Sequence, residues 1–388
     1  MNICMLTPTY LPTEGGTQRA IKSLAGALAR RGHCVTVVTP DEHMFGNTSQ
    51  HGAQFHVIRF PFSRARGCIF LTQNARCFLQ VLEQHRSEAF DYLHLFHVVS
   101  FGISSILLKK VVRTPLITTL MGDDSYSWKE EIGQQTLSYR FTRPYASWIM
   151  NSSDLVTAPS QNLTHHAHVQ GCKREIVVIP HGVDPERFDP AAVRRRASNL
   201  RARLGLRDRE HMILTVQRLI KRKDLETVIL AMPKILQEKP NVKLVVVGEG
   251  PERERLLRLA STTGVASSVI FAGSVPESEK PSYYGAADLF LLSTLYEAFG
   301  LVLVEAMAAA KCVIASKTGA VPEIVQDQVT GFVFPPGRVQ DLAVLVLRAL
   351  EDDTLRTEMG LRGRERALAN YSWDRITERY CAAYAQLR

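Results

Sequence analysis

The segment LFLLSTLYEAFGLVLVEAM, residues 289–307, holds two acids, Glu297 and Glu305, in an otherwise almost wholly apolar stretch. An uncompensated carboxylate is costly to bury, so both acids need partners. The run LFLLST has the composition of a buried strand, and the residues from about Leu301 onward have that of a helix. Glu297 is therefore predicted at the carboxyl edge of a sheet and Glu305 on the first turns of a helix. Ligands bind at this edge in open α/β sheets.

A second loop, in the stretch TVQRLIKRKD, brings Arg218 and Lys223 to the same sheet edge. A forked guanidinium and a compact ammonium in one loop suit a diphosphate better than a lone carboxylate. The amides of Phe299, Gly300 and Leu301 would begin a helix, which is a natural site for an anion. The two acids would then flank the anion and accept protons from sugar and ribose hydroxyls.

Each of these residues also has an ordinary structural interpretation. Glu297 would cap a helix, and Glu305 would lie on the surface of an amphipathic helix. Arg218 and Lys223 would be surface charges, and GEG at 248–250 would be only a tight turn. As a set, however, these residues favour a diphosphate site.

The N-terminal residues have the order of a βαβ unit. Residues 2–7 predict a strand, 17–32 an amphipathic helix closed by Gly32, and 34–39 a second strand. Gly15 and Gly16 lie between the first strand and its helix, but their spacing does not complete G-x-G-x-x-G. A dinucleotide site is therefore not supported, although a glycine pair still lets a backbone amide approach a phosphate.

The same alternation continues along the chain and restarts once. Further strands are expected at 55–60, 92–95, 116–120, 154–157 and 176–179, and after the restart within HMILTVQRL, KLVVVGEG, SVIFAG, ADLFLLST and KCVIAS.

Alternating strands and helices need a parallel sheet covered on both faces. Two such series predict an α/β protein with two Rossmann-like, doubly wound domains facing across a cleft. We expect an acceptor-binding domain at 1–185 and a nucleotide-sugar-binding domain at 186–367. The terminal helix, 368–388, would cross back to brace the first domain.

Composition restricts the class of protein. The chain has 388 residues, of which 45% are hydrophobic, enough for more than one core. No apolar run reaches the length of about 18 residues that a membrane span needs, and the N-terminus lacks the basic start of a signal peptide. The cysteines number 7, an odd set that favours a reducing compartment, and their spacing predicts no metal site. We therefore expect a cytoplasmic protein.

The chain is basic, with 47 Lys and Arg against 38 Asp and Glu and a formal net charge of +9. Such an excess attracts phosphates or an anionic membrane surface. The densest part, residues 194–209, is either a solvated linker or helix face, or a surface for acidic lipid or polyanion. The arginine-bearing, partly apolar stretch 62–82 is either a buried helix with a basic edge or a peripheral contact with the inner face of the membrane. No nucleic-acid partner is expected.

Several blocks of the chain, taken in order, resemble one family. They are EGGTQR, ARRGHCVTVVT, DYLHLFH, PHGVDPERFDP, QRLIKRKD, VVVGEGPERERL, IFAGSVPESE, YEAFGLVLVEAM and TGAVPEIVQDQVTGFVFPP. Each block alone is weak, but the ordered set resembles the retaining glycosyltransferases of the GT-B fold, in the large group called family 4. The resemblance covers nearly the whole chain.

The resemblance implies roles for the residues of the second domain. Glu297 and Glu305 match an E-x7-E motif, in which the first acid contacts the donor sugar and the second the ribose. Arg218 and Lys223 match a diphosphate-binding pair. The segment Gly273 to Val275 is similar to the edge that holds the base, and the amides of Phe299, Gly300 and Leu301 would bind phosphate and donor sugar.

In the first domain, Gly16 matches the glycine whose amide meets the diphosphate from the N-terminal side. The family often has His before Gly in the block seen here as TLMGDDSY, and this chain has Met121 there. Asp123 or His97 would then face the acceptor. Alternatively, Asp123 would be a helix cap and His97 a core or supporting residue. His181 stands where the family often has Asn.

The resemblance implies transfer of a sugar from a UDP- or GDP-linked donor to a hydroxyl of a glycan, lipid-linked or small-molecule acceptor, with retention of configuration and without metal or cofactor. Two alternatives stay open. One is an epimerase or phosphorylase on the same scaffold; in a phosphorylase, Lys311 would hold pyridoxal phosphate. The other is a polyanion-binding scaffold that keeps the fold without the chemistry.

Overall fold

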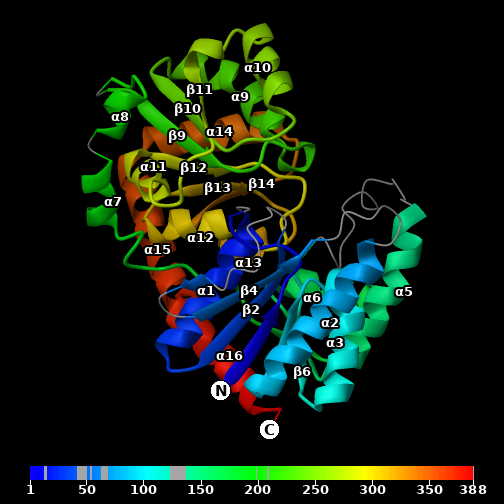
Figure 1. Ribbon diagram of the computed structural model, residues 1–388. Helices are drawn as coiled ribbons and strands as arrows, with labels where there is room; N and C mark the ends of the chain where they lie inside the picture. The colour runs from blue at the N-terminus through cyan, green and yellow to red at the C-terminus, as the bar shows by residue number, and fades with distance from the viewer. Residues whose placement is uncertain are drawn as a thin grey trace. The chain divides into compact units, whose positions relative to one another are not determined.

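The structure is a computed structural model that describes residues 1–12, 15–41, 50–52, 55–62, 69–122, 137–197, 199–207 and 209–387 (Figure 1). It divides into two compact units. Unit 1 consists of Met1–His181 with Trp373–Arg388, and unit 2 of Gly182–Ser372. In both units strands alternate with helices along the chain.

The described part of unit 1 contains an eight-stranded sheet in the order β3-β4-β2-β1-β5-β6-β7-β8. All of its pairs are parallel except β3 with β4. The strands are β1 (Asn2–Leu6), β2 (Cys34–Asp41), β3 (Gln50–Gly52), β4 (Phe55–Pro61), β5 (Tyr92–Phe96), β6 (Leu116–Thr119), β7 (Leu155–Ala158) and β8 (Ile176–Val178).

The parallel strands of this sheet are buried on both faces. On the central strand β1, Ile3 is in register with Val35 of β2 and with Tyr92 of β5. All three side chains are buried, as the strands of a sheet covered on both faces must be. The parallel strands expected from sequence are all present, whereas β3, whose residues QHG have no apolar pattern, was not predicted.

The helices of unit 1 cover this sheet. Gly32, with φ at 80°, follows the end of α1 as the sequence predicts. Figure 1 shows α16 running beside α1. The helices are α1 (Gly16–Arg30), α2 (Ile69–Ser87), α3 (Val98–Val112), α5 (Leu137–Ser152), α6 (Gln161–Val169) and α16 (Trp373–Ala385).

Unit 2 has a parallel sheet in the order β11-β10-β9-β12-β13-β14. The strand order reverses between β9 and β12, and ligands bind at the carboxyl edge of such a switch point. The strands are β9 (His211–Val216), β10 (Val242–Val247), β11 (Val269–Gly273), β12 (Leu289–Leu292), β13 (Val313–Ser316) and β14 (Gly331–Phe334).

Two apolar cores lie on the two faces of this sheet. Alternate residues of β9 supply them, with Leu214 in one core and Ile213 in the other. The covering helices are α7 (Pro190–Arg196), α8 (Leu200–Arg203), α9 (Leu225–Glu238), α10 (Arg253–Thr262), α11 (Lys280–Ala286), α12 (Leu301–Ala308), α13 (Val321–Ile324), α14 (Val339–Glu351) and α15 (Asp353–Tyr371), with 3-10 turns η1 (Lys221–Lys223) and η2 (Ala266–Ser268).

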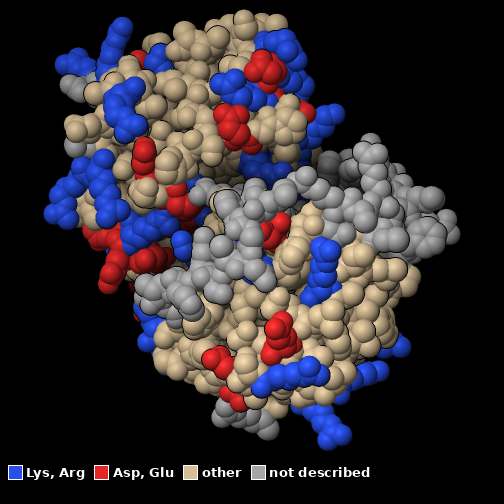
Figure 2. Space-filling model, in the orientation of Figure 1, with Lys and Arg blue, Asp and Glu red and all other residues tan. Residues whose placement is uncertain are grey.

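The arginine-rich segment 194–209 forms parts of α7 and α8, over which Lys and Arg side chains gather in Figure 2. Most of its arginines are exposed. Arg201 is an exception: it donates a hydrogen bond of 2.8 Å to the carbonyl of Ala286, at the end of α11, and lies 3.5 Å from Asp288. Cations stabilise the C-terminal ends of helices, so part of the basic excess is structural.

A buried polar network ties α16 to the sheet of unit 1. The ring nitrogens of His94 lie 2.7 Å from the hydroxyl of Tyr384 and 2.6 Å from that of Thr119. The Thr119 hydroxyl is in turn 2.6 Å from that of Thr157. Burial lowers the pKa of His94 to about 3, because the imidazolium would lose its hydration.

This network predicts a pH dependence of folding. The folded-state pKa of His94 lies below the unfolded value of about 6.5, so the unfolded chain binds the extra proton between pH 6.5 and 3. The free energy of unfolding should therefore fall as pH decreases through this window. Replacing His94 by Gln should reduce the slope by up to about 1.4 kcal/mol per pH unit.

Urea unfolding of both proteins between about pH 4.5 and 6.5 measures the two slopes. Burial also lowers the pKa of His181, to about 4, but that residue is present in both proteins and cancels. Equal slopes for wild type and His94→Gln would contradict the assignment.

Candidate active site

Arg218 and Lys223 lie in the loop that leaves β9 at the carboxyl edge of the unit 2 sheet. The turn η1 shapes this loop: the amide of Lys223 donates to the carbonyl of Ile220 at 2.9 Å. The Arg218 side chain is exposed, and within the described ranges it has no hydrogen bond or ion pair. Arg218 thus offers an unengaged guanidinium at the edge where the sequence expects one.

Glu297 lies in the loop between β12 and α12, as the strand–loop–helix pattern predicts. Its carboxylate forms an ion pair with the ammonium of Lys223. Both side chains are largely buried, with exposed fractions of 14% and 16%. The residue that caps α12 is Gly300, with no side-chain hydrogen bond, so the interpretation of Glu297 as a helix cap is wrong. Its partner is a cation from the neighbouring loop.

Short hydrogen bonds hold the two loops together behind this pair. The amide of Leu295 donates to the carbonyl of Arg222 at 2.8 Å, and the Thr294 hydroxyl donates to the same carbonyl at 3.1 Å. The Ser293 hydroxyl donates to the carbonyl of Asp224. The positions of Lys223 and Glu297 are therefore fixed through the backbone as well as through their charges.

Two glycines let the loops after β10 and β13 pack closely against the loops that carry Arg218 and Glu297. A Cβ on Gly248, in the GEG turn after β10, would lie 1.9 Å from the carbonyl oxygen of Gln217. A Cβ on Gly319, after β13, would lie 2.1 Å from the carbonyl oxygen of Glu297. Their φ angles are 134° and 52°, which favour glycine. The GEG turn thus supports the Arg218 loop, and Gly319, which the sequence did not single out, supports Glu297.

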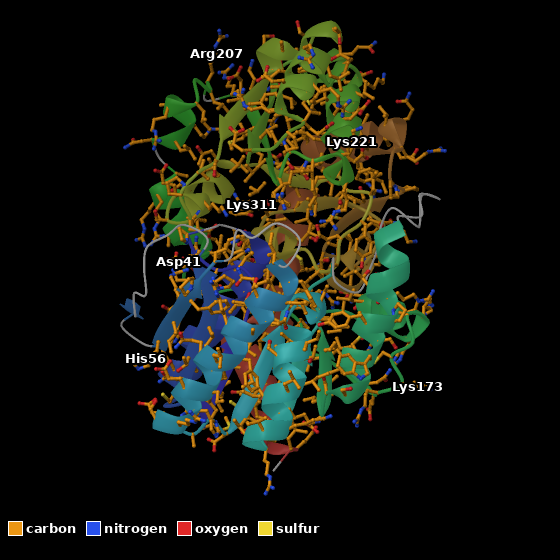
Figure 3. The ribbon with its side chains drawn as sticks, turned by 45° about the vertical axis from the view of Figure 1, so that its right-hand side comes forward. Asp41, His56, Lys173, Arg207, Lys221 and Lys311 are labelled. Atoms are coloured by element: carbon orange, nitrogen blue, oxygen red, sulfur yellow. The ribbon has the colours of Figure 1, made fainter. Side chains whose placement is uncertain are left out.

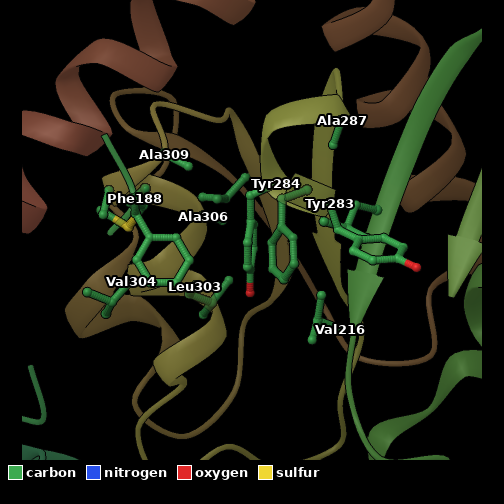
Figure 4. Close-up of a cluster of buried hydrophobic side chains, with 14 of the residues drawn as sticks. Phe188, Val216, Tyr283, Tyr284, Ala287, Leu303, Val304, Ala306 and Ala309 are labelled. Carbon is green, nitrogen blue, oxygen red and sulfur yellow. The ribbon is translucent and has the colours of Figure 1, made fainter. Parts of the chain in front are cut away.

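Glu305 is buried on α12, with 6% of its surface exposed. It accepts a hydrogen bond of 2.7 Å from the hydroxyl of Tyr284 on α11. Figure 4 shows the Tyr284 ring within the apolar core, near Phe188 and Leu303. The interpretation of Glu305 as a surface residue is therefore wrong. Tyr284 was missed because nothing in the sequence pairs a core tyrosine with an acid on another helix.

The remaining predicted residues of unit 2 gather at the same edge. Gly300, with φ at 102°, begins α12, and the ring of the preceding Phe299 packs against Tyr371. Gly273 ends β11, and its carbonyl accepts a hydrogen bond of 2.8 Å from the amide of Gly248. Val275 is buried, as the Phe299 ring is, whereas Leu301 is half-buried. What these residues could present to a ligand is thus mainly backbone.

In unit 1, Gly15 and Gly16 lie at the start of α1, after β1. Gly15 has φ at −167°, an extended backbone that any residue can adopt. His97 follows β5 and caps α3 with φ at 70°, a strained position for a side chain other than glycine. Asp123 lies outside the described residues. The roles of these four residues stay predictions.

Lys311 lies at the opposite edge of the unit 2 sheet from Glu297, because it precedes β13 whereas Glu297 follows β12. Its ammonium donates to the carbonyl of Ala287 at 2.7 Å. Burial lowers the pKa of Lys311 to about 8. A cofactor held by Lys311 would be remote from the candidate site, which argues against the phosphorylase alternative.

Comparisons with known proteins agree with this fold. The family model described as Glycosyl transferases group 1 matches residues 197–366, and the one described as Glycosyltransferase Family 4 matches residues 14–187.

Three individual proteins show the extent of the similarity. A GDP-mannose-dependent alpha-(1-6)-phosphatidylinositol monomannoside mannosyltransferase of Mycolicibacterium smegmatis is 34% identical over 95% of this chain and 94% of its own. An N-acetyl-alpha-D-glucosaminyl L-malate synthase of Bacillus anthracis is 26% identical over 97% and 95%. The solved structure of a sucrose-phosphate synthase from Thermosynechococcus elongatus superposes with a TM-score of 0.85 at 25% identity, covering 100% of this chain and 98% of that one.

Two doubly wound parallel-sheet units with these structural neighbours define the GT-B fold of glycosyltransferases. The chain belongs to glycosyltransferase family 4.

Replacing Gly319 by Ala should displace the loop that carries Glu297, because the new Cβ would overlap a backbone oxygen. We expect turnover to fall by on the order of 10- to 100-fold, the usual effect of misplacing a reacting group by about 1 Å. Gly264→Ala is the matched control, since Gly264 also has positive φ, 73°, but open space around it.

The control should lose about 1–2 kcal/mol of stability from backbone strain and keep its turnover. Steady-state kinetics and thermal unfolding of both variants measure these effects. Equal turnover in the two variants would show that the approach of Gly319 to Glu297 is irrelevant to the site.

Proposed function

We propose that this glycosyltransferase moves a sugar from a UDP- or GDP-linked donor to a hydroxyl group, with retention of anomeric configuration. The observation that carries the proposal is the Lys223–Glu297 ion pair, beside the exposed Arg218, at the switch point of the unit 2 sheet. The Mycolicibacterium relative supports it, because its name specifies GDP-mannose as the donor.

Lys223 and Arg218 would neutralise the diphosphate of the donor. In the free protein Glu297 compensates the charge of Lys223. When a diphosphate enters, Lys223 gains a second anionic partner, and the Glu297 carboxylate can accept hydrogen bonds from hydroxyls of the donor sugar. The first amides of α12, at Gly300 and Leu301, would bind phosphate oxygens, because amides at the start of a helix have no partner within the helix.

Glu305 would bind the ribose hydroxyls. The hydrogen bond from Tyr284 holds its carboxylate in place within the core. A carboxylate fixed in this way loses little conformational freedom on binding, so more of the contact energy appears as affinity. The base would lie along the edge from Gly273 to Val275.

The carboxylate next to the expected donor position is already paired, which disfavours a covalent glycosyl intermediate. Glu297 forms its ion pair with Lys223. We therefore favour a front-face displacement: the acceptor oxygen forms the new bond to the anomeric carbon as the bond to the diphosphate breaks, and the leaving diphosphate takes the acceptor proton. Lys223, Arg218 and the start of α12 stabilise the charge that develops on the leaving group, with no divalent metal.

The acceptor would be a glycan, a lipid-linked molecule or a small molecule. One relative is named for a phosphatidylinositol monomannoside and another for L-malate. Within the described ranges, no helix is both long and apolar enough to cross a membrane.

A lipid-linked acceptor would require peripheral contact with a membrane, for which unit 1 has a suitable face. The helices α2 and α3 pack against each other. Leu71 and Leu79 of α2 are 63% and 62% exposed, which does not fit the alternative of a buried helix for this stretch. Leu107 and Val111 of α3 are also exposed, at 48% and 56%, and Arg76 is an exposed cation on α2. An apolar surface with flanking cations suits an anionic bilayer.

Replacing Lys223 by Ala should lower turnover by on the order of 100-fold or more, as loss of one electrostatic stabiliser does. Release of nucleoside diphosphate from a panel of UDP- and GDP-sugars, in the presence of EDTA, measures it. Lys221→Ala is the matched control, because Lys221 is an exposed residue of the same turn and should be dispensable.

Near-normal turnover in Lys223→Ala would contradict the assignment. Tight nucleotide binding by the wild type without sugar release or transfer would instead favour the non-catalytic scaffold. Activity abolished by EDTA and restored by a divalent cation would refute metal independence.

The membrane contact predicts salt-dependent sedimentation with anionic vesicles, present at low and lost at high ionic strength. Substitution of both Leu71 and Leu79 by Ser should weaken binding several-fold, because apolar area is removed from the contact. Val344→Ser in unit 2, where Val344 is 62% exposed, is the control and should bind as wild type. No sedimentation of the wild type at either salt concentration would exclude this surface.

A further inference from the structure

Three polar side chains lie at the carboxyl ends of β2 and β4 in unit 1. Thr39, Asp41 and Arg59 are 0%, 5% and 4% exposed. Each has a buried atom that no other atom of the described protein hydrogen-bonds: Oγ1 of Thr39, Oδ1 of Asp41 and Nε of Arg59. Such groups are rare in folded proteins, where buried polar atoms are nearly always satisfied.

The three side chains share one face of the sheet. Thr39 is in register with Arg59 on the neighbouring strand, so both point the same way. Asp41 is two residues beyond Thr39 and therefore projects from the same face. Phe60, which alternates with Arg59, contacts Phe101 of α3 on the other face, at 5.8 Å between rings. Thr39, Asp41 and Arg59 thus form one polar cluster at the sheet edge; Figure 3 labels Asp41.

The fold itself does not account for this cluster. In the same unit, the network of His94, Thr119 and Thr157 is also buried, and its side-chain atoms bond one another. Among the described residues, the Arg59 side chain has one hydrogen bond, from Nη2 to the carbonyl of Leu11, and no ion pair with Asp41. A buried donor or acceptor without a hydrogen-bond partner costs its full desolvation free energy. Three such groups close together are therefore expected where a ligand supplies the partners.

The chemistry of the cluster selects the ligand class. Asp41 accepts hydrogen bonds, Arg59 donates them and Thr39 does both. The two charges are opposite, so the cluster has no net charge and does not favour an anion. A ring with adjacent hydroxyls presents a donor and an acceptor at each oxygen, which matches this set.

We propose that Thr39, Asp41 and Arg59 bind adjacent hydroxyls of a polyhydroxylated ring, a sugar or cyclitol, that belongs to the acceptor. The proposal rests on the transferase function proposed above and adds the acceptor chemistry to it.

The hydroxyl of Thr39 has no hydrogen-bond partner among the described residues, so removing it should affect stability and ligand binding in opposite ways. Thr39→Val removes an unsatisfied hydroxyl at nearly constant shape, so the variant should be as stable as wild type or more stable. Its affinity for a polyol should fall by about tenfold. Thr119→Val is the control: that hydroxyl is bonded to His94 and Thr157, so the variant should lose stability and keep its affinity.

Titration of the full chain with methyl α-glucoside, methyl α-mannoside and myo-inositol measures polyol affinity, and urea unfolding measures stability. Asp41→Asn provides a second variant, which should bind polyols at least tenfold more weakly. Inorganic phosphate and L-malate are the anionic probes, with Arg59→Gln as their variant.

Weaker polyol binding in Thr39→Val and Asp41→Asn, without loss of stability, would support the proposal. It would be overturned by unchanged polyol affinity, by destabilisation of Thr39→Val, by the absence of polyol binding, or by binding of the anions alone in a manner that Arg59→Gln abolishes. Hydrolysis of the nucleotide sugar without acceptor should persist in all variants. If the wild type does not hydrolyse the nucleotide sugar, the transferase function is refuted instead. The two tests are separate, because the polyol titration needs no donor.

Discussion

The ion pair between Lys223 and Glu297 is the contact on which the candidate site depends. It joins the loops that leave β9 and β12, the two strands between which the sheet order reverses. Two charges withdrawn from water need each other, and the hydrogen bonds to the carbonyl of Arg222 keep their loops in register. Because these contacts already fix the ammonium of Lys223, an anion would bind it at little further cost in conformational entropy.

Close backbone approach is the second constraint. Gly248 and Gly319 bring the loops after β10 and β13 against those after β9 and β12, at distances that no side chain allows. Four strand ends are thus locked to one another at one edge of the unit 2 sheet. Glu305 is fixed in a different way, through Tyr284 and the core between α11 and α12. The site is rigid where we expect the leaving group, as electrostatic stabilisation of a transition state requires.

Unit 1 has two buried polar clusters, one around His94 and one formed by Thr39, Asp41 and Arg59, which differ in whether their hydrogen bonds are satisfied. Around His94 every polar neighbour has a partner, and burial keeps the imidazole neutral. That network fastens α16 to the sheet. The cluster of Thr39, Asp41 and Arg59 is equally buried but has atoms without partners. The first arrangement stabilises the fold, whereas the second is explained by a ligand that supplies the missing hydrogen-bond partners.

The amino-acid sequence alone predicts the alternation of strands and helices, and hence two doubly wound sheets, because hydrophobic periodicity is a local property. It also placed Glu297 in a strand-to-helix loop, and its ordered blocks indicated the family. The folded structure was needed to show that Glu297 pairs with Lys223, that Tyr284 holds Glu305 and that Gly319 supports the loop. Whether Thr39 or Thr119 has a partner was equally invisible in the sequence. These features depend on distances between residues far apart in the chain, which packing alone sets.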